Sequence, residues 1–253
     1  MFHDELLVSL GYQGIATSSS MAHQTPSSRR PTHFLSLRLG RADGGQLYQR
    51  MAGLQREAVE RHPELEPCIC APTDAHITLF VMSLADEAQV AMAASALERC
   101  PLPAPSSTHG SSCFQLTLGP GLGRFGSGVL FMPLCENEEA VRLRAWVEVL
   151  HAAFASENLV EQPHRFKAHV TLMKTSKLKS KSRPKGRGRG GVSGSRGRGR
   201  GRGGRVVIGA DVEQMVQGGE TFGTHTIGSV ELLRMSRRDA DGFYFCEARR
   251  GLG

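Results

Sequence analysis

The chain has 253 residues, of which 40% are hydrophobic, and its mean hydropathy is -0.25. This length can bury the core of one large domain or two small lobes, and no apolar run approaches the roughly 18 residues that a membrane span needs. The six cysteines are scattered, which predicts reduced thiols in an intracellular protein. A membrane protein and a small disulfide-stapled protein are thereby excluded as classes.

The charge is unevenly distributed along the chain. Thirteen of the 31 Lys and Arg residues fall between Lys174 and Arg205, a stretch without any acidic residue. The remainder has 18 basic and 24 acidic residues, a net charge of -6. The sequence therefore predicts a mildly acidic folded body that carries a basic arm, and such an arm favours an anionic partner.

Composition divides the chain into three parts. Residues 1–30 are Ser-rich and are expected to form a disordered leader without a catalytic role. Two alternatives stay open, a targeting peptide and a start at Met21. The folded domain is expected over residues 31–253, interrupted by a disordered Arg/Gly-rich insertion over residues 175–205.

The first half of the domain alternates strand-like and helix-like segments. Residues 32–39 show strand alternation, and residues 46–62 have helical spacing that Pro63 ends. The apolar face of that helix is predicted to comprise Leu47, Met51, Leu54 and Val59. A buried strand over residues 75–84 and a helix over residues 86–100 are expected next.

The second half predicts two hairpins around a long helix. Residues 114–134 form the first expected hairpin, with a glycine-rich turn, and residues 226–248 form the second. The helix spans residues 137–159 and is capped by Asn137. Its predicted apolar face comprises Val141, Leu143, Trp146, Val149, Leu150 and Phe154. A strand is expected over residues 164–175, and the whole pattern predicts an α+β fold with antiparallel pairing.

Two of the apolar strands carry the same short motif. Residues 75–80 read AHITLF and residues 168–173 read AHVTLM. Three His-x-Thr triplets occur in the sequence where about 0.5 is expected by chance. The third, at residues 23–25, lies in the polar leader and has no strand context. One such motif alone is best explained by a structural histidine, whereas two in equivalent positions favour a shared site.

Strand periodicity gives this repeat a chemical meaning. Residues i and i+2 of a strand point to the same face, so His76 projects beside Thr78. In the same way, His169 projects beside Thr171. Two imidazoles can supply a general base and a general acid to opposite sides of a phosphodiester, while two hydroxyls bind its non-bridging oxygens. Such chemistry requires no metal.

These motifs and the segments around them resemble the 2H phosphoesterase superfamily. The likeness is to the branch with the nuclear-localisation-signal domain of kinase-anchoring protein 7 and the phosphoesterase domain of activating signal cointegrator 1 complex subunit 1. It is carried, in this order, by RPTHFLSLRL, HITLFVM, FKAHVTLMK, FGTHTIGSVELLRMS and DGFYFCEA. The resemblance implies a bilobal, LigT-like fold with two antiparallel sheets, helices on their outer faces and a central cleft.

The resemblance also assigns roles to individual residues. It makes His76 and His169 the catalytic residues and Thr78 and Thr171 the ligands of the substrate phosphate, and Lys174 is a further candidate for a substrate contact. The implied enzyme is a phosphodiesterase that cleaves 2′,3′-cyclic phosphates or 2′,5′-linked phosphodiesters at RNA or oligonucleotide ends, without metal or cofactor. It is expected to be a monomer that does not bind membranes.

The basic arm allows further interpretations. Arg-Gly repeats resemble segments that bind RNA through phosphate charge and guanidinium stacking, and residues 177–185 also fit a nuclear import signal. A location in the nucleus, the cytoplasm or both is therefore expected. A neutral surface insertion is the alternative for the arm. For the whole chain, a non-catalytic RNA-binding adaptor and a phosphoesterase of small nucleotides both stay open.

Overall fold

The computed structural model describes residues 30–40, 45–160, 166–176, 206–216 and 219–253. The expected leader, apart from Arg30, and the basic arm, apart from Thr175 and Ser176, lie outside the described residues. No helix in the described ranges is long and apolar enough to cross a membrane. All six cysteines are described, and each is a free thiol.

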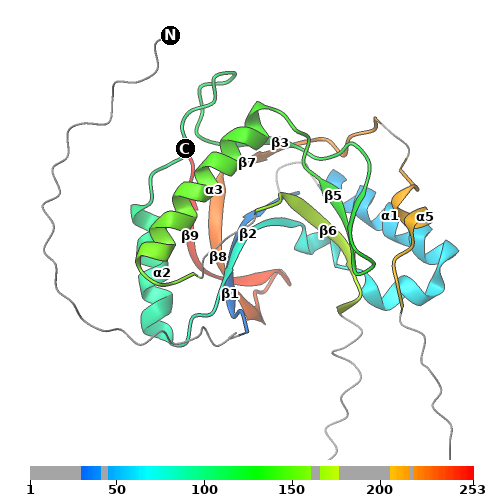
Figure 1. Cartoon of the computed structure of the whole chain (residues 1–253), viewed down its shortest axis with the longest axis horizontal. Helices are drawn as coiled ribbons and strands as arrows, with labels where there is room; N and C mark the ends of the chain where they lie inside the picture. The colour runs from blue at the N-terminus through cyan, green and yellow to red at the C-terminus, as the bar shows by residue number, and fades with distance from the viewer. Residues whose placement is uncertain (1–29, 41–44, 161–165, 177–205, 217–218) are drawn as a thin grey trace, which may run out of the picture.

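Seven strands form one sheet in the order β4-β5-β6-β2-β1-β8-β9 (Figure 1). These strands are β1 (His33–Arg38), β2 (His76–Met82), β4 (Gly123–Phe125), β5 (Val129–Pro133), β6 (His169–Lys174), β8 (Ser229–Arg238) and β9 (Tyr244–Gly251). A second sheet pairs β3 (Phe114–Thr117) with β7 (Thr224–Ile227). All pairings among the described strands are antiparallel, which confirms the predicted α+β class with two antiparallel sheets.

Helices cover the two ends of the large sheet. They are α1 (Gln46–Arg61), α2 (Glu87–Arg99), α3 (Glu138–Ser156) and the short α5 (Ala210–Glu213). In Figure 1, α2 and α3 lie together over the end with β1, β8 and β9, whereas α1 and α5 lie at the end with β5 and β6. A hydrogen bond of 2.5 Å between Nε2 of His62 and Oδ2 of Asp211 joins the end of α1 to α5.

Two β-α-β units repeat within this fold. In β1-α1-β2 and in β5-α3-β6, the two strands are antiparallel neighbours and the intervening helix packs over the opposite unit. The amide of Gln55 in α1 donates to the carbonyl of Leu172 in β6 at 2.9 Å. Phe154 in α3 packs on Phe80 in β2, with ring centroids 5.3 Å apart. Each helix thus packs on a strand of the other unit, and these contacts hold the two β-α-β units together at β2 and β6.

The caps of the helices follow from the sequence, but their buried faces differ from the prediction. Asn137 accepts a hydrogen bond from the backbone N–H of Ala140 at 3.0 Å, which confirms the predicted cap. Val141 and Val149 of α3 are 58% and 44% exposed, so their assignment to the apolar face is wrong. Val147 is buried instead, because it lies on the same stripe as the other buried side chains of α3.

The buried face of α1 also departs from the expected one. Leu47 and Met51 are buried as predicted, but Gln55 and Ala58 complete the face and Val59 is only partly covered. Gln55 can be buried because its side-chain amide is hydrogen-bonded: it donates to the carbonyl of Cys70 at 2.7 Å as well as to that of Leu172. In α1, the position of a residue around the helix therefore decides its burial more than its hydrophobicity does: Gln55 is buried and Val59 is not fully buried.

The first predicted hairpin is only partly correct. Residues 114–117 form β3, which pairs with β7 and not with β5. The glycine-rich segment contains a strand of its own, since Gly123–Phe125 pairs with β5 as β4. That segment is long enough to form a hairpin with residues 129–131, which leaves β3 free to pair elsewhere. The second hairpin, β8 with β9, is confirmed.

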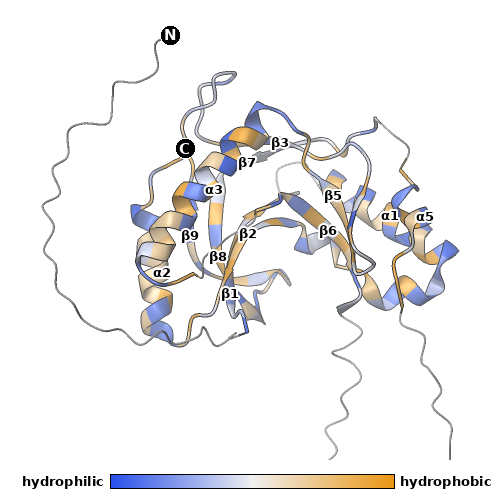
Figure 2. Cartoon of the chain, viewed as in Figure 1, coloured by the Kyte–Doolittle hydropathy of each residue, from blue (hydrophilic) through white to orange (hydrophobic). Residues whose placement is uncertain are grey.

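The core lies between the large sheet and the helices. Figure 2 shows hydrophobic residues gathered along the central strands and alternating with hydrophilic ones along the helices. Ile77 and Leu79 of β2, with Val170 and Leu172 of β6, are buried in this core. Because strand residues alternate in direction, the residues between them face the other side of the sheet.

Candidate active site

The two His-x-Thr motifs meet at the centre of the large sheet. Strands β2 and β6 are antiparallel neighbours with Ile77 opposite Val170. In this register His76 lies across from Thr171, and the other two motif residues, His169 and Thr78, lie across from each other. All four side chains are partly buried on the face away from the core. The sequence motifs thus form one site with approximate twofold symmetry.

Both motifs are followed by a β-bulge at the same position. The pairing of β1 with β2 skips Leu79, and the pairing of β5 with β6 skips Leu172. A bulge adds one residue to a strand and shifts the alternation of its side chains. Because of the bulges, Val81 and Lys174 lie on the same face of the sheet as the motif side chains. Without the bulges, Phe80 and Met173 would lie on that face.

A cavity of about 310 Å³ opens on this face. Its lining includes His76, Thr78, Thr171 and Lys174, so four of the five predicted site residues share one cavity. The size falls within the range of about 300–1,000 Å³ that is typical of small-molecule sites. His169 is not part of the described lining and lies beside it on β6.

Further residues of this cavity were not predicted. Asp74 precedes β2, and Arg238 and Tyr244 come from the two strands of the β8–β9 hairpin. Phe34 of β1 contributes an aromatic wall. The hairpin was predicted from its turn, but its reach to the motif strands is a tertiary feature that no local pattern encodes.

The backbone fixes both imidazoles in the same way. Nδ1 of His76 lies 2.6 Å from the carbonyl oxygen of Asp74, and Nδ1 of His169 lies 2.7 Å from that of Lys167. Each carbonyl belongs to the residue two positions before the histidine. A carbonyl can only accept, so Nδ1 carries the hydrogen and Nε2 of the neutral ring is left to exchange a proton with a ligand.

Aromatic rings surround each histidine. The ring of His76 lies 5.2 Å from Phe34 and 5.7 Å from Tyr244, measured between centroids. The ring of His169 lies 4.9 Å from Phe125 and 5.2 Å from Phe131. These contacts remove water from the imidazoles and hold their planes.

Burial affects the protonation of both residues. It lowers the pKa of His76 to about 4, and the positive charges of Lys174 and His169 act in the same direction, whereas the carbonyl and carboxylate of Asp74 oppose them. The pKa of His169 is also lowered, first by burial and then by the charge of Lys167. In the free protein His76 is therefore neutral throughout the physiological pH range.

Within the part of the chain that the structure describes, no group of three or more His, Cys, Asp and Glu side chains is placed to hold a metal ion. The cavity is lined by an imidazole, two threonine hydroxyls, a lysine, an aspartate and an arginine.

Comparison with known proteins agrees with this geometry. Residues 31–252 match the family described as the AKAP7 2′5′ RNA ligase-like domain. Human A-kinase anchor protein 7 isoform gamma is 29% identical over 150 residues, which are 58% of this chain and 41% of that protein. The matched region is thus under half of that relative's length. The Escherichia coli LigT structure, complexed with 3′-AMP, has a TM-score of 0.51 at 13% identity and covers 88% of this chain and 98% of LigT.

The LigT-like fold and the paired motifs define the class as the 2H phosphoesterase superfamily. Within that superfamily, the chain belongs to the family of AKAP7 2′5′ RNA ligase-like domains. The resemblance inferred from the motifs and the LigT-like fold that it implied are both confirmed.

Proposed function

We propose that this protein is a phosphodiesterase of RNA or oligonucleotide ends, acting on 2′,3′-cyclic phosphates or 2′,5′-linked phosphodiesters. The observation that carries the proposal is the symmetric presentation of two imidazoles and two hydroxyls on adjacent strands, beside one cavity. Membership of the 2H superfamily supports a phosphoester substrate. The bound 3′-AMP of the structurally similar LigT supports a nucleotide.

The two histidines divide the proton transfers. His76 is the general base, because its pKa near 4 keeps it neutral and able to accept a proton. As water attacks phosphorus, its proton passes to Nε2 of His76 and the new P–O bond forms. The bond to the leaving oxygen breaks, and Nε2 of protonated His169 donates to that oxygen. Exchange with solvent restores both rings.

The remaining side chains bind the phosphate. The hydroxyls of Thr78 and Thr171 donate to its two non-bridging oxygens, and the ammonium of Lys174 stabilises the charge that develops on them. A bound anion also raises the pKa of His169, so that the acid is protonated when substrate is present. In this scheme the protein supplies all the groups that the reaction needs, and we expect EDTA to leave turnover unchanged.

A non-catalytic adaptor that binds RNA in the same cavity is the competing function. The two can be separated with a panel of 2′,3′-cyclic nucleotides, 2′,5′-oligoadenylate and 3′-tailed RNA. Wild type should turn over at least one of them, whereas His76→Ala and His169→Ala should bind it with turnover lowered by about 10²-fold or more. The double variant should bind it without turnover, and all three variants should keep the wild-type Tm. Binding by wild type without turnover of any substrate would favour the adaptor, and an active double variant would reject the catalytic assignment.

The basic arm is a separate proposal. We propose that residues 175–205 raise RNA affinity through phosphate contacts and that the arm also serves nuclear import. Deletion of residues 177–204 should weaken RNA binding and reduce the slope of log affinity against log salt concentration, while turnover of a small cyclic nucleotide is retained. An unchanged slope would show that the arm is a neutral insertion.

A further inference from the structure

An ion pair joins the β8–β9 hairpin to the residue that orients His76. Nη1 of Arg238 lies 2.5 Å from Oδ1 of Asp74, and Nη2 lies 3.1 Å from Oδ2. The side chain of Asp74 is only 13% exposed. A guanidinium that contacts both oxygens fixes the orientation of a carboxylate as well as its position.

Asp74 is also the residue whose backbone carbonyl accepts the hydrogen bond from Nδ1 of His76. It ends the short 3-10 segment Pro72–Asp74, and only Ala75 separates it from β2. Rotation of the peptide after Asp74 would remove the acceptor from the imidazole. The ion pair of Arg238 with the carboxylate of Asp74 opposes that rotation.

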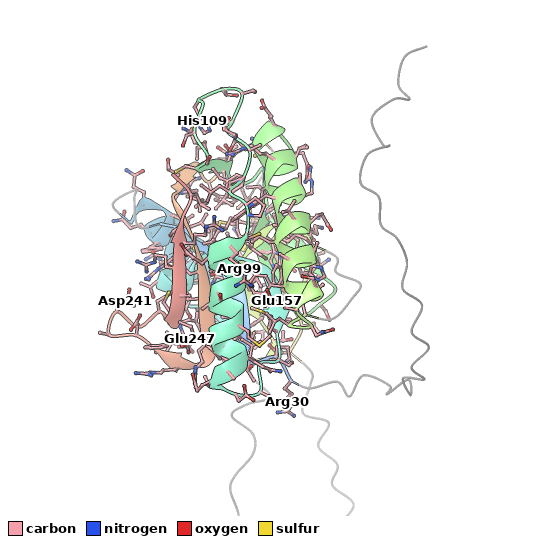
Figure 3. All side chains as sticks on the ribbon, turned by 90° about the vertical axis from the view of Figure 1, so that its left-hand side faces the viewer. Arg30, Arg99, His109, Glu157, Asp241 and Glu247 are labelled. Carbon is pink, nitrogen blue, oxygen red and sulfur yellow. The ribbon has the colours of Figure 1, made fainter. Side chains whose placement is uncertain are left out.

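The hairpin that supplies Arg238 is itself fixed near His76. The guanidinium carbon of Arg238 lies 3.9 Å from the centroid of the Tyr244 ring, which in turn contacts His76 edge-on. Within the turn between β8 and β9, Asp241 forms an ion pair of 3.0 Å with Arg38. Arg38 is the residue of β1 that pairs with His76. Figure 3 shows Asp241 at the projecting tip of this hairpin. Two ion pairs thus tie the hairpin to the strands that hold the histidine.

Among the described residues, the second histidine has no equivalent arrangement. Its carbonyl partner is Lys167, whose Nζ lies 5.3 Å from the ring centroids of both Phe125 and Phe131. No ion pair joins Lys167 to another residue of the described ranges. Within the described ranges, an ion pair to the residue that provides the carbonyl is found only in the His76 half of the site.

We propose that Arg238 is a positioning residue for His76, which acts by holding Asp74 so that its carbonyl keeps the imidazole in the Nδ1–H tautomer. The kinetic consequences of this inference rest on the proposed function, but the tautomer does not. In its absence, the ring would also populate the Nε2–H form, which cannot accept a proton from the attacking water.

The charged groups around His76 give the proposal a second, directional signature. Asp74, Lys174 and His169 act on its pKa, and Cys70, Arg238 and Tyr244 line the same cavity. Loss of Arg238 leaves the charge of Asp74 without its counter-ion, so the pKa of His76 should rise. Loss of the Asp74 charge should lower it. A general packing defect would not shift the two variants in opposite directions.

The tautomer can be observed by two-bond ¹H–¹⁵N correlation NMR of the full chain at about pH 7, where His76 is neutral. The signals of His76 are assigned by their loss in His76→Gln. Wild type should show the Nδ1–H form alone, and Arg238→Gln and Asp74→Asn should show a mixture of tautomers. Arg238→Lys should restore part of the wild-type signal. The control is Arg237→Gln, because the neighbouring Arg237 stacks on Phe245 and should leave the spectrum unchanged.

Kinetics on the substrate identified above provide the second readout. Arg238→Gln should lower kcat by about 10- to 100-fold with a small change in KM, since a misplaced base affects the chemical step. The acid limb of kcat/KM should move to higher pH in Arg238→Gln and to lower pH in Asp74→Asn. A pure Nδ1–H spectrum in Arg238→Gln would overturn the proposal. Absence of turnover in wild type would instead reject the proposed function, and the NMR comparison would still decide the role of Arg238.

Discussion

The two β-α-β units share one backbone plan but surround their histidines with different chemistry. Each places a histidine two residues after a carbonyl that accepts from Nδ1, and each has a bulge one residue after its threonine. The residue that provides the carbonyl is acidic in one unit, Asp74, and basic in the other, Lys167. The residue two positions after the bulge is Val81 in one unit and Lys174 in the other. Backbone symmetry thus places the imidazoles alike, whereas the charged side chains around them differ.

Replacement of the histidines should have the largest effect and should separate their roles. We expect His76→Gln and His169→Gln each to lower kcat by about 10²- to 10⁴-fold, the usual contribution of a general acid or base. The residual activity should lose its acid limb in His76→Gln and its alkaline limb in His169→Gln. The pH dependence of kcat/KM for both variants measures this, and loss of the same limb in both would show that the halves are not specialised.

The helices that cross between the units differ in how they are anchored. Phe154→Ala in α3 should lower the free energy of unfolding by about 3–5 kcal/mol, because it empties a fully buried site against Phe80. Gln55→Leu in α1 should cost about 1–2 kcal/mol through the loss of two buried hydrogen bonds. Urea denaturation gives both values. A larger cost for Gln55→Leu would mean that the polar anchor dominates.

The buried histidine on β2 should make stability depend on pH. A histidine with a pKa of about 6.5 in the unfolded chain and about 4 in the folded protein binds its proton more readily when unfolded. Its contribution is therefore fully present above pH 6.5 and is lost as the pH falls toward 4. We expect a loss of about 2–3 kcal/mol over this window in wild type and a much smaller loss in His76→Gln. Equal slopes in the two proteins would argue against the lowered pKa.

The two residues that follow the bulges on the cavity face, Val81 and Lys174, should show the smallest effect. Lys174→Ala should raise KM about 10-fold, as expected for loss of a charged contact to phosphate, and should also raise the pKa of His76. Val81→Ala changes the equivalent position of the other unit and should alter KM less than twofold, which makes it the matched control. Similar KM values for the two variants would show that Lys174 does not contact the substrate.

Local patterns in the sequence predicted much of this fold. The strands with the two motifs, the cap at Asn137 and the β8–β9 hairpin depend on contacts within a short stretch of chain. The pairing of β3 with β7 joins residues more than one hundred positions apart, and no local pattern records it. The exposed Val141 and Val149 show the same limit, because hydrophobicity alone does not say which side of a helix meets the sheet.

For the candidate site, the motifs predicted the chemical groups but not their environment. His76, Thr78 and Thr171 share a cavity because strand periodicity and the pairing of β2 with β6 bring them together. Asp74 and Arg238 are 164 positions apart in the sequence, so their ion pair depends on the complete fold. The bulges are likewise set by tertiary packing, and they explain why Lys174 faces the cavity.

The proposed roles of His76 as base and His169 as acid are tested most directly by the pH dependence of kcat/KM for wild type on a 2′,5′-linked or 2′,3′-cyclic substrate. A neutral base and a protonated acid, both with lowered pKa values, predict a bell-shaped profile. Its acid limb should lie near pH 4 and its alkaline limb below the ordinary histidine value of about 6.5. A rate that rises steadily with pH and reaches a plateau would contradict the assignment of a histidine acid.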